Sequence, residues 1–347
     1  MNIKKLLSTL LLIVTGAVSF AQGNAGATVD GQKSRAAEPK RNAVVELSSI
    51  YMRLGADYES PLETMELLGT VVEIVNEKGY WREIVTPQPY KAWCTELGLV
   101  EMSEEEIREY NESRKVMYTQ LYGHLYSEPS FSSNTIRDLV GGDVLRLVRR
   151  GHRWTEVMLP SGKKGFIPNQ ELKDFDGFRT IAKGEGNSDS VSEAETDKFI
   201  SSALSLLGSP YLWGGMTPKG VDCSGLVRWS YLMNGILLPR NASQMIFCGD
   251  PVEMRYDISF WDESKRTDSN AFLAEMKGRI ANLKRGDLVF FGTPANAGQR
   301  QKVTHVGIYL GDGKMIHSSH LVRINSLLPS DDEFYENSYR LLGAVRL

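Results

Sequence analysis

The chain has 347 residues, which is long enough for two or three domains. Apolar residues make up 41% of it and charged residues 24%, a balance typical of soluble globular proteins and not of disordered ones. The small formal net charge of −3 argues against nucleic-acid binding by bulk charge, which needs clusters of lysine and arginine.

The first 21 residues are typical of a secretory signal peptide. Lys4 and Lys5 precede the apolar run Leu6–Val14, and Ser19-Phe20-Ala21 provides a cleavage site near Ala21. The run is shorter than the roughly 18–20 residues that a membrane-spanning helix needs, and no later segment is long and apolar enough. We therefore predict an exported protein, periplasmic or extracellular, with no stable membrane insertion after the signal peptide is cleaved.

Two segments in the first half of the chain share a pattern of short apolar strands separated by turns. In each segment a tryptophan opens a strand, Trp81 in the first and Trp154 in the second. The pattern is typical of small all-β barrels, and the two segments resemble bacterial SH3-like domains. Strands are expected at 71–75, 80–85 and 90–93 in the first segment, and at 143–148, 154–159 and 165–167 in the second.

The last part of the chain is predicted to be an α+β domain, because helical patterns come first and strands follow. A Gly-rich loop ends at Cys223, an apolar helical run follows it, and a further helix is expected at 271–280. Strands are expected at 287–291, 303–310, 314–318 and 342–346. The predicted division is a signal peptide at 1–21, a linker at 22–40, a first SH3-like domain at 41–102, a linker helix at 103–114, a second SH3-like domain at 115–180, a linker at 181–197 and the α+β domain at 198–347.

The sequence contains three cysteines, Cys94, Cys223 and Cys248, an odd number that leaves at least one thiol free. We expect Cys94 and Cys248 to be buried thiols, with a disulfide between them as the alternative. Cys223 is expected at a helix N-terminus, where the helix dipole should lower its pKa and favour the reactive thiolate. The cysteine and histidine spacings match no zinc pattern, and we expect no metal or other cofactor.

A cysteine nucleophile needs an imidazole base within hydrogen-bond reach, and His305 on an apolar strand is the candidate. A second histidine on the next strand could orient His305, and the turn between the strands decides which one. A two-residue turn, Asp312-Gly313, would put His320 opposite His305. A three-residue turn, Gly311-Asp312-Gly313, would put His317 diagonal to His305 on the same face. The residues alone leave both alternatives open.

Residues 198–347 carry motifs that resemble the NlpC/p60 superfamily of papain-like cell-wall peptidases. With two SH3-like segments ahead of them, the chain resembles the γ-D-glutamyl-L-diamino acid endopeptidases of that superfamily. The motifs are Tyr211-x-Trp213-Gly214-Gly215-x-Thr217-x-x-Gly220-x-Asp222-Cys223-Ser224-Gly225, then Gly286-Asp287-Leu288, then His305-Val306-Gly307-Ile308-Tyr309, and finally Ile316-His317-Ser318.

The resemblance implies a role for each matching residue. Cys223 would be the nucleophile and His305 its base, and His317 would orient His305. Tyr211 would help to bind and polarise the carbonyl of the substrate. Further substrate contacts are expected from Trp213, Asp222, Ser224, Asn241 and Ala242 in the same domain, and from Tyr90 and Trp93 of the first SH3-like domain.

One position departs from the family. Members of this substrate class often carry R-D-x-S/D-Q after the cysteine helix, where the aspartate helps to hold the free amine of an N-terminal L-Ala. Here the segment is Arg240-Asn241-Ala242-Ser243-Gln244, and Asn241 can accept a hydrogen bond but brings no charge. The amine could still be held by Asp222, or by an acidic or tyrosine side chain of the first SH3-like domain.

The resemblance thus implies an exported, monomeric cysteine endopeptidase that acts on peptides derived from peptidoglycan. It would hydrolyse the bond between γ-D-Glu and the diamino acid, in peptides that carry a free N-terminal L-Ala. The alternatives are a wall-anchored autolysin that cuts intact stem peptides, and a cell-wall-binding protein without catalytic activity.

Overall fold

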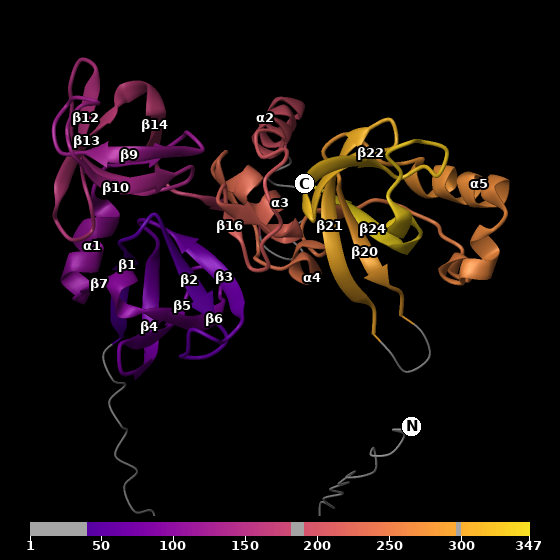
Figure 1. The fold of residues 1–347 in the computed structure, drawn as a ribbon, viewed down its shortest axis with the longest axis horizontal. Helices are drawn as coiled ribbons and strands as arrows, with labels where there is room; N and C mark the ends of the chain where they lie inside the picture. Colours follow the sequence, from indigo (N-terminus) through magenta and orange to yellow (C-terminus); the bar gives the residue numbers. More distant parts are fainter. Residues whose placement is uncertain (1–39, 182–190, 296–299) are drawn as a thin grey trace, which may run out of the picture. The chain divides into compact units, whose positions relative to one another are not determined.

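The computed structural model describes residues 40–181, 191–295 and 300–347, which belong to one compact unit, Lys40–Leu347 (Figure 1). The predicted signal peptide, the predicted linker at 22–40 except Lys40, and most of the predicted linker at 181–197 lie outside the described residues. No helix in this described part of the chain is long and apolar enough to cross a membrane.

The first part of the unit is a seven-stranded antiparallel sheet with a buried apolar core on which Ala43, Met52 and Ile84 converge. Its strand order is β3-β2-β6-β5-β4-β1-β7. The strands are β1 (Arg41–Val45), β2 (Ser49–Arg53), β3 (Leu62–Leu67), β4 (Val71–Lys78), β5 (Trp81–Val85), β6 (Lys91–Thr95) and β7 (Leu99–Met102).

A second seven-stranded antiparallel sheet follows, with the order β10-β9-β13-β12-β11-β8-β14. Counted from its own first strand, this order is the same as that of the first sheet, so the weak sequence similarity corresponds to a structural repeat. No pairing joins β3 to β7 or β10 to β14 in the described ranges, and closure into barrels stays a prediction. The strands are β8 (Lys115–Tyr118), β9 (Tyr122–Tyr126), β10 (Thr135–Val140), β11 (Val144–Arg150), β12 (Trp154–Met158), β13 (Lys164–Pro168) and β14 (Leu172–Phe175).

Helix α1 (Glu104–Glu112) connects the two sheets, within the helix expected at 103–114. Ser103 begins it with a capping box, in which its hydroxyl accepts from the Glu106 N–H and the Glu106 carboxylate accepts from the Ser103 N–H. The shorter elements are η1 (Glu96–Gly98), η2 (Asn169–Glu171), η3 (Ile258–Trp261), η4 (Glu263–Arg266), η5 (Glu336–Arg340), β15 (Arg179–Thr180), β16 (Met216–Thr217), β17 (Gly220–Val221) and β18 (Ile236–Leu237).

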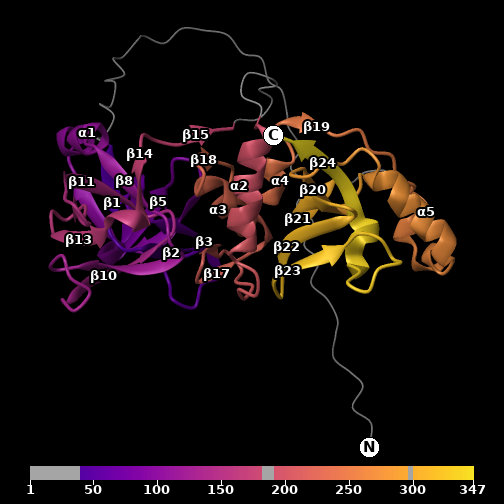
Figure 2. The same cartoon turned by 90° about the horizontal axis from the view of Figure 1, so that it is seen from above.

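The last part is a six-stranded sheet with helices on both faces, as Figures 1 and 2 show. Helices α2, α3 and α4 cover one face and α5 covers the other. The helices are α2 (Glu193–Leu204), α3 (Cys223–Leu232), α4 (Ala242–Met245) and α5 (Ser269–Ile280). The sheet has the order β19 (Asp250–Pro251), β24 (Leu341–Arg346), β20 (Leu288–Thr293), β21 (Lys302–Gly311), β22 (Lys314–Ser319) and β23 (Leu321–Ser326).

Several elements differ from the sequence expectation. Strands β1–β3 and β8–β10 and helix α4 were not predicted, and α2 and β23 are two further cases. Helix α2 begins at Glu193, inside the segment expected to be a linker, because Ser192 and Glu195 form a capping box that starts the helix early. Strand β23 was not expected, because its apolar residues Val322 and Ile324 are too few to stand out from the turn before them.

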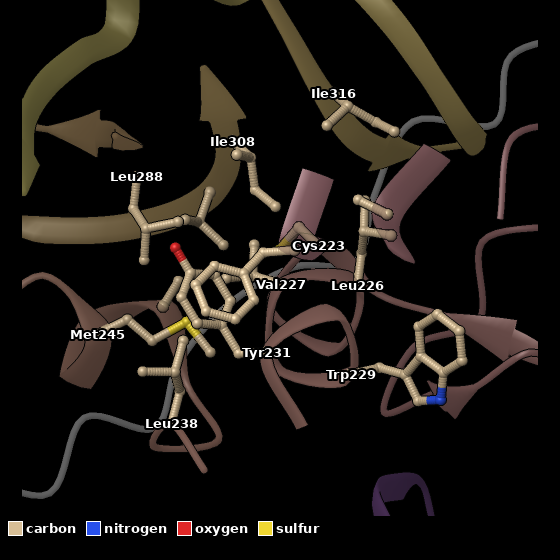
Figure 3. Close-up of a cluster of buried hydrophobic side chains, with 14 of the residues drawn as sticks. Cys223, Leu226, Val227, Trp229, Tyr231, Leu238, Met245, Leu288, Ile308 and Ile316 are labelled. Atoms are coloured by element: carbon tan, nitrogen blue, oxygen red, sulfur yellow. The ribbon is translucent and has the colours of Figure 1, made fainter. Parts of the chain in front are cut away.

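Helix α3 is buried along its whole length and packs on the sheet. Figure 3 shows Leu226 pointing toward Ile316 of β22, and Trp229 pointing away from the sheet. The indole N–H of Trp229 donates to the Gly141 carbonyl, 2.9 Å away, beside the second antiparallel sheet. The helix that begins with Cys223 is therefore held from both sides.

Candidate active site

The loop before α3 is shaped by close backbone contacts that only glycine permits. Asp222 is the N-cap of α3, and its Oδ1 accepts from the Gly225 N–H at 2.7 Å. A Cβ at Gly225 would lie 2.0 Å from the Gly215 carbonyl oxygen, and Gly214 has φ +74°. These constraints explain why Cys223 at the first helical position is flanked by glycines on both sides.

Asp222 is engaged by a buried arginine. Its two oxygens accept from Arg240 Nη1 and Nη2, at 3.1 and 2.6 Å, and the Arg240 side chain is 3% exposed. Asp222 also accepts from the Gly214 N–H and the Ser224 hydroxyl. We expected that Asp222 could hold a substrate amine, but its acceptor positions are already occupied by these donors. The Ser224 hydroxyl also has its partners within the protein, because it donates to Asp222 and accepts from Arg240.

The same arginine connects this loop to the first sheet. Arg240 Nε donates to the Thr64 hydroxyl of β3 at 2.7 Å. A Cβ on Gly214 would lie 3.0 Å from the carbonyl carbon of Glu63, so the loop and β3 pack backbone against backbone. Strand β3 thus lies beside the cysteine-bearing loop.

Two histidines and an asparagine form a hydrogen-bonded line across β21, β22 and β23. His305 Nε2 lies 2.7 Å from His317 Nδ1, and His317 Nε2 lies 2.9 Å from Asn325 Oδ1. The Asn325 amide nitrogen donates to the Glu333 carbonyl, so its oxygen faces His317 as an acceptor. His317 therefore carries its proton on Nε2, and His305 must donate from Nε2. The other ring nitrogen of neutral His305, Nδ1, is left with a free lone pair.

The strand register that makes this line possible arises from a bulge. Ile308 pairs with Ile316, which puts His317 opposite Gly307 and diagonal to His305, the register expected from a three-residue turn. The turn itself has two residues, Asp312 and Gly313, both with positive φ, and the register shifts between Tyr309 and Gly311. The structure therefore combines the two-residue turn with the strand register that we expected from the three-residue turn.

The alternative histidine, His320, lies elsewhere. It is exposed in the turn after β22 and has φ +63°, and its carbonyl accepts from the Tyr211 N–H at 2.9 Å. The His317 side chain is fully buried. His320 thus contributes backbone to the site, and the imidazole that contacts His305 is that of His317.

Both imidazoles are held in the neutral form. Burial lowers the pKa of His305 to about 3, and the nearby His317, Arg323 and Arg340 lower it further. Burial likewise lowers the pKa of His317 to about 4, although its hydrogen bond to Asn325 opposes the shift. Neutral His305 is the form that can accept a proton.

The thiol does not have the low pKa that its place at a helix N-terminus led us to expect. Burial raises the pKa of Cys223 to about 11, and the charge of Asp222 adds to this. The backbone N–H groups of Val306 and Ser224 act in the opposite direction, which places the sulfur beside the strand residue that follows His305. Desolvation is the largest of these effects, and together with the lowered pKa of His305 it favours a neutral thiol and a neutral imidazole.

Two tyrosines lie around the thiol. Burial raises the pKa of Tyr211 to about 12, and the charge of Cys223 is the next largest cause, so the phenol and the thiol are close. Tyr335, which sequence reasoning missed, packs its ring 5.8 Å from His305 and 4.8 Å from His317, centroid to centroid. Tyr335 and Asn325 come from irregular or unexpected segments, and no motif pointed to them.

The remaining predicted contacts are placed as follows. Trp213 is 66% exposed in the glycine loop, and Tyr90 donates its phenol to Glu63 Oε2 at 2.7 Å. Trp93 is half-buried in β6, where it pairs with Arg53 of β2 and Glu83 of β5. Asn241 is the N-cap of α4 and Ala242 is its first, buried residue.

The other cysteines play no part in this arrangement. Cys94 and Cys248 are both free thiols, so the alternative of a disulfide between them is wrong. In the described ranges, no group of three or more His, Cys, Asp or Glu side chains could hold a metal ion.

The chain is similar to known proteins in sequence and in fold. Residues 208–339 match the model of the NlpC/P60 family. A γ-D-glutamyl-L-lysine dipeptidyl-peptidase of Bacillus cereus is 27% identical over 293 residues, which span 80% of this chain and 73% of the relative. Dipeptidyl-peptidase 6 of Lysinibacillus sphaericus is 26% identical, over 82% of this chain and 92% of the relative.

A solved structure extends the likeness beyond the matched residues. The crystal structure of an NlpC/P60 family protein from Bacillus cereus has a TM-score of 0.65 with 22% identity, over 88% of this chain and 99% of that one. At this identity the comparison shows a shared fold.

The depressed histidine pKa values predict an acid-sensitive fold. In the unfolded chain a histidine titrates near pH 6.5, so the unfolded state binds more protons than the folded state between about pH 6.5 and the folded-state pKa values of about 4 for His317 and about 3 for His305. Stability should be complete above this window and fall as the pH drops through it, by on the order of 1.4 kcal/mol per unit of pKa difference. Chemical denaturation at pH 7 and at pH 4.5 measures this loss.

His317→Gln, which cannot titrate, should reduce this acid-induced loss, whereas His320→Gln at the exposed histidine should retain it. Equal pH dependence in the parent and His317→Gln would show that His317 is not held neutral.

Proposed function

Residues 208–339 form an NlpC/P60 family domain, and from this premise we propose that the chain is a cysteine peptidase that acts on murein peptides. We propose that it cuts the bond between γ-D-glutamate and the diamino acid. The observation that carries the proposal is the line His305–His317–Asn325, which leaves Nδ1 of His305 free. His305 lies on β21, whose next residue, Val306, contacts Cys223 through its N–H. The names of the relatives, which include a γ-D-glutamyl-L-lysine dipeptidyl-peptidase, support the choice of substrate.

In the proposed mechanism Cys223 Sγ attacks the γ-carbonyl carbon of D-glutamate while its proton passes to His305 Nδ1. His305 keeps donating from Nε2 to His317, so forming the imidazolium requires no exchange of tautomers. Collapse of the tetrahedral intermediate breaks the C–N bond, and His305 returns the proton to the leaving amine. Water then attacks the thioester, with His305 as base, and the acid product leaves.

The oxyanion of the intermediate is proposed to lie between the backbone N–H of Cys223 and the Tyr211 phenol. The high pKa of the phenol keeps it protonated and able to donate a hydrogen bond. The raised pKa of the thiol means that the proton moves as the sulfur attacks, and not in an earlier ionisation step. Tyr335 covers the imidazoles and keeps bulk water from them.

We propose that the two N-terminal sheets are SH3-like domains, and that the first one limits access to the substrate cleft. Glu63 and Tyr90 of this sheet form a hydrogen-bonded pair beside the loop that carries Gly214 and Cys223. Because Asn241 brings no charge and Asp222 is bound by Arg240, Glu63 is the carboxylate best placed to hold a free N-terminal amine. Such a site would select peptides already released from glycan, and the enzyme would work in cell-wall recycling after export.

The first test is hydrolysis of L-Ala-γ-D-Glu-L-Lys, and of the diaminopimelate analogue, followed by mass spectrometry of the products. We expect L-Ala-γ-D-Glu and the free diamino acid to appear. Cys223→Ala should abolish turnover with an unchanged circular dichroism spectrum, because it removes the proposed nucleophile and neither of the other two thiols, Cys94 and Cys248, is part of the site. Cleavage at another bond, or turnover by folded Cys223→Ala, would refute the proposed function.

The roles of the two nearby histidines can be separated kinetically. His317→Ala should lower kcat/KM by about 100-fold or more, because it removes the acceptor that fixes the His305 tautomer. His320→Ala should change kcat/KM by less than about fivefold, because only its backbone carbonyl contacts the site. Equal losses in the two variants would contradict the assignment of His317.

The preference for a free amine is tested with a matched pair of peptides, one with free L-Ala and one whose L-Ala is acylated by muramic acid. We expect the free peptide to be cut at least about tenfold faster, since the Glu63 carboxylate would lose its charged partner when acylation turns the ammonium into a neutral amide. Glu63→Gln should remove most of this preference. If both peptides are cut equally by the parent enzyme, the chain is a wall-cutting autolysin.

A further inference from the structure

A cavity lies where α1, α3 and both N-terminal sheets meet, and Cys223 is not among its lining residues. Its volume is about 640 Å³, in the range of sites for small molecules. The apolar part of its lining includes Leu232, Leu237 and Phe178, and its polar part includes Glu66 of β3 and Arg228 of α3.

In the polar part of the lining, Glu66 and Arg228 each have a buried atom without a hydrogen-bond partner among the described residues. Glu66 is 4% exposed and Arg228 is 2% exposed, and both line the cavity. Arg228 Nη2 lies 3.7 Å from Glu66 Oε1, which is longer than a hydrogen bond. Glu66 Oε1 and Arg228 Nε are buried without a hydrogen-bond partner among the described residues. The charge of Arg240 also acts on both side chains, but it gives Glu66 Oε1 no hydrogen bond. A buried ion pair that is incompletely hydrogen-bonded is costly.

The chemistry of the two orphaned groups defines what would complete them. The guanidinium of Arg228 is suited to a carboxylate, which it can bind in a planar, two-pronged fashion. The orphaned oxygen of Glu66 requires a donor, and an ammonium group supplies a charged one. Because the two side chains are close together, one small molecule that carries both groups a few ångströms apart would satisfy them. The apolar walls would take its side chain.

This cavity is separate from the peptidase site. Arg228 follows Cys223 by five positions, which at about 100° per residue puts their side chains roughly 140° apart around α3. Glu66 is on the same face of β3 as Thr64, the residue that accepts from Arg240. A ligand here would therefore contact the two elements that hold the cysteine loop, without entering the cleft.

We propose that this cavity binds a small zwitterion of the α-amino-acid class, with its carboxylate on Arg228 and its ammonium on Glu66. Burial raises the pKa of Glu66 and lowers that of Arg228, so each of these charges is desolvated in the protein alone. The bound amino acid would form hydrogen bonds with both the Glu66 carboxylate and the Arg228 guanidinium.

The test is isothermal titration calorimetry of the full chain with free amino acids (L-alanine, L-leucine, L-glutamate and L-lysine) at millimolar concentration. We expect at least one to bind with a stoichiometry of one. Acetate and ethylammonium, which each carry only one of the two groups, should bind at least about tenfold more weakly. Failure of every amino acid to bind would overturn the proposal.

Substitutions at Glu66 and Arg228 test whether the amino acid binds in this cavity. Glu66→Gln and Arg228→Gln should each weaken binding by about tenfold or more, whereas Glu63→Gln, on the same strand but beside the cysteine loop, should leave it unchanged. The nearly isosteric Glu66→Gln decides the matter if Arg228→Gln does not fold. Loss of binding in Glu63→Gln with retention in Glu66→Gln would place the amino acid in the peptidase cleft and overturn the proposal.

Discussion

The ion pair between Asp222 and Arg240 is the contact on which the rest of the site depends. It joins the N-cap of α3, the glycine loop, the segment before α4 and, through Thr64, the first sheet. Its geometry is two-pronged and every remaining acceptor of Asp222 is used, which is the condition under which a buried pair offsets its desolvation. Loss of either partner would leave one charge buried and release the loop that positions Cys223.

The histidine line follows a different physical rule. Its members are neutral and hydrogen-bonded to one another, and the direction of each shared proton is set by the last link, the amide of Asn325. The low dielectric that makes an imidazolium unfavourable at rest also strengthens its hydrogen bond to His317 once a proton arrives. The site thus combines a thiol whose pKa is raised with an imidazole whose pKa is lowered, and both shifts favour the uncharged form.

Much of this fold could be predicted from local pattern. The alternating strands of the last sheet and the helix after Cys223 have strong periodicity, and the repeat of the first half was visible in its two strand-opening tryptophans. The register of β21 and β22 could only be narrowed to two alternatives, because a bulge at Leu310 adds a residue that no propensity marks. Asn325 and Tyr335 could not be found, since their roles depend on long-range packing of short segments.

The thiol pKa was predicted in the wrong direction for a related reason. A helix N-terminus is visible in a sequence, whereas the depth at which it is buried is a property of the whole fold. The pairing of Asp222 with Arg240 is equally hidden, because 18 positions separate the two along the chain. Local chemistry thus identified the candidate residues, and the tertiary structure determined their charges.

The equal strand order of the two N-terminal sheets has a consequence for how the protein is built. In each sheet the same edge strand contacts the cysteine loop, β3 through Thr64 and Glu63, and β10 through the ion pair of Asp138 with Lys219 at the tip of the β16–β17 hairpin. The two N-terminal sheets therefore contact the same loop at two separate points. The loop that carries Cys223 is therefore braced from outside its own domain, by one strand of each N-terminal sheet.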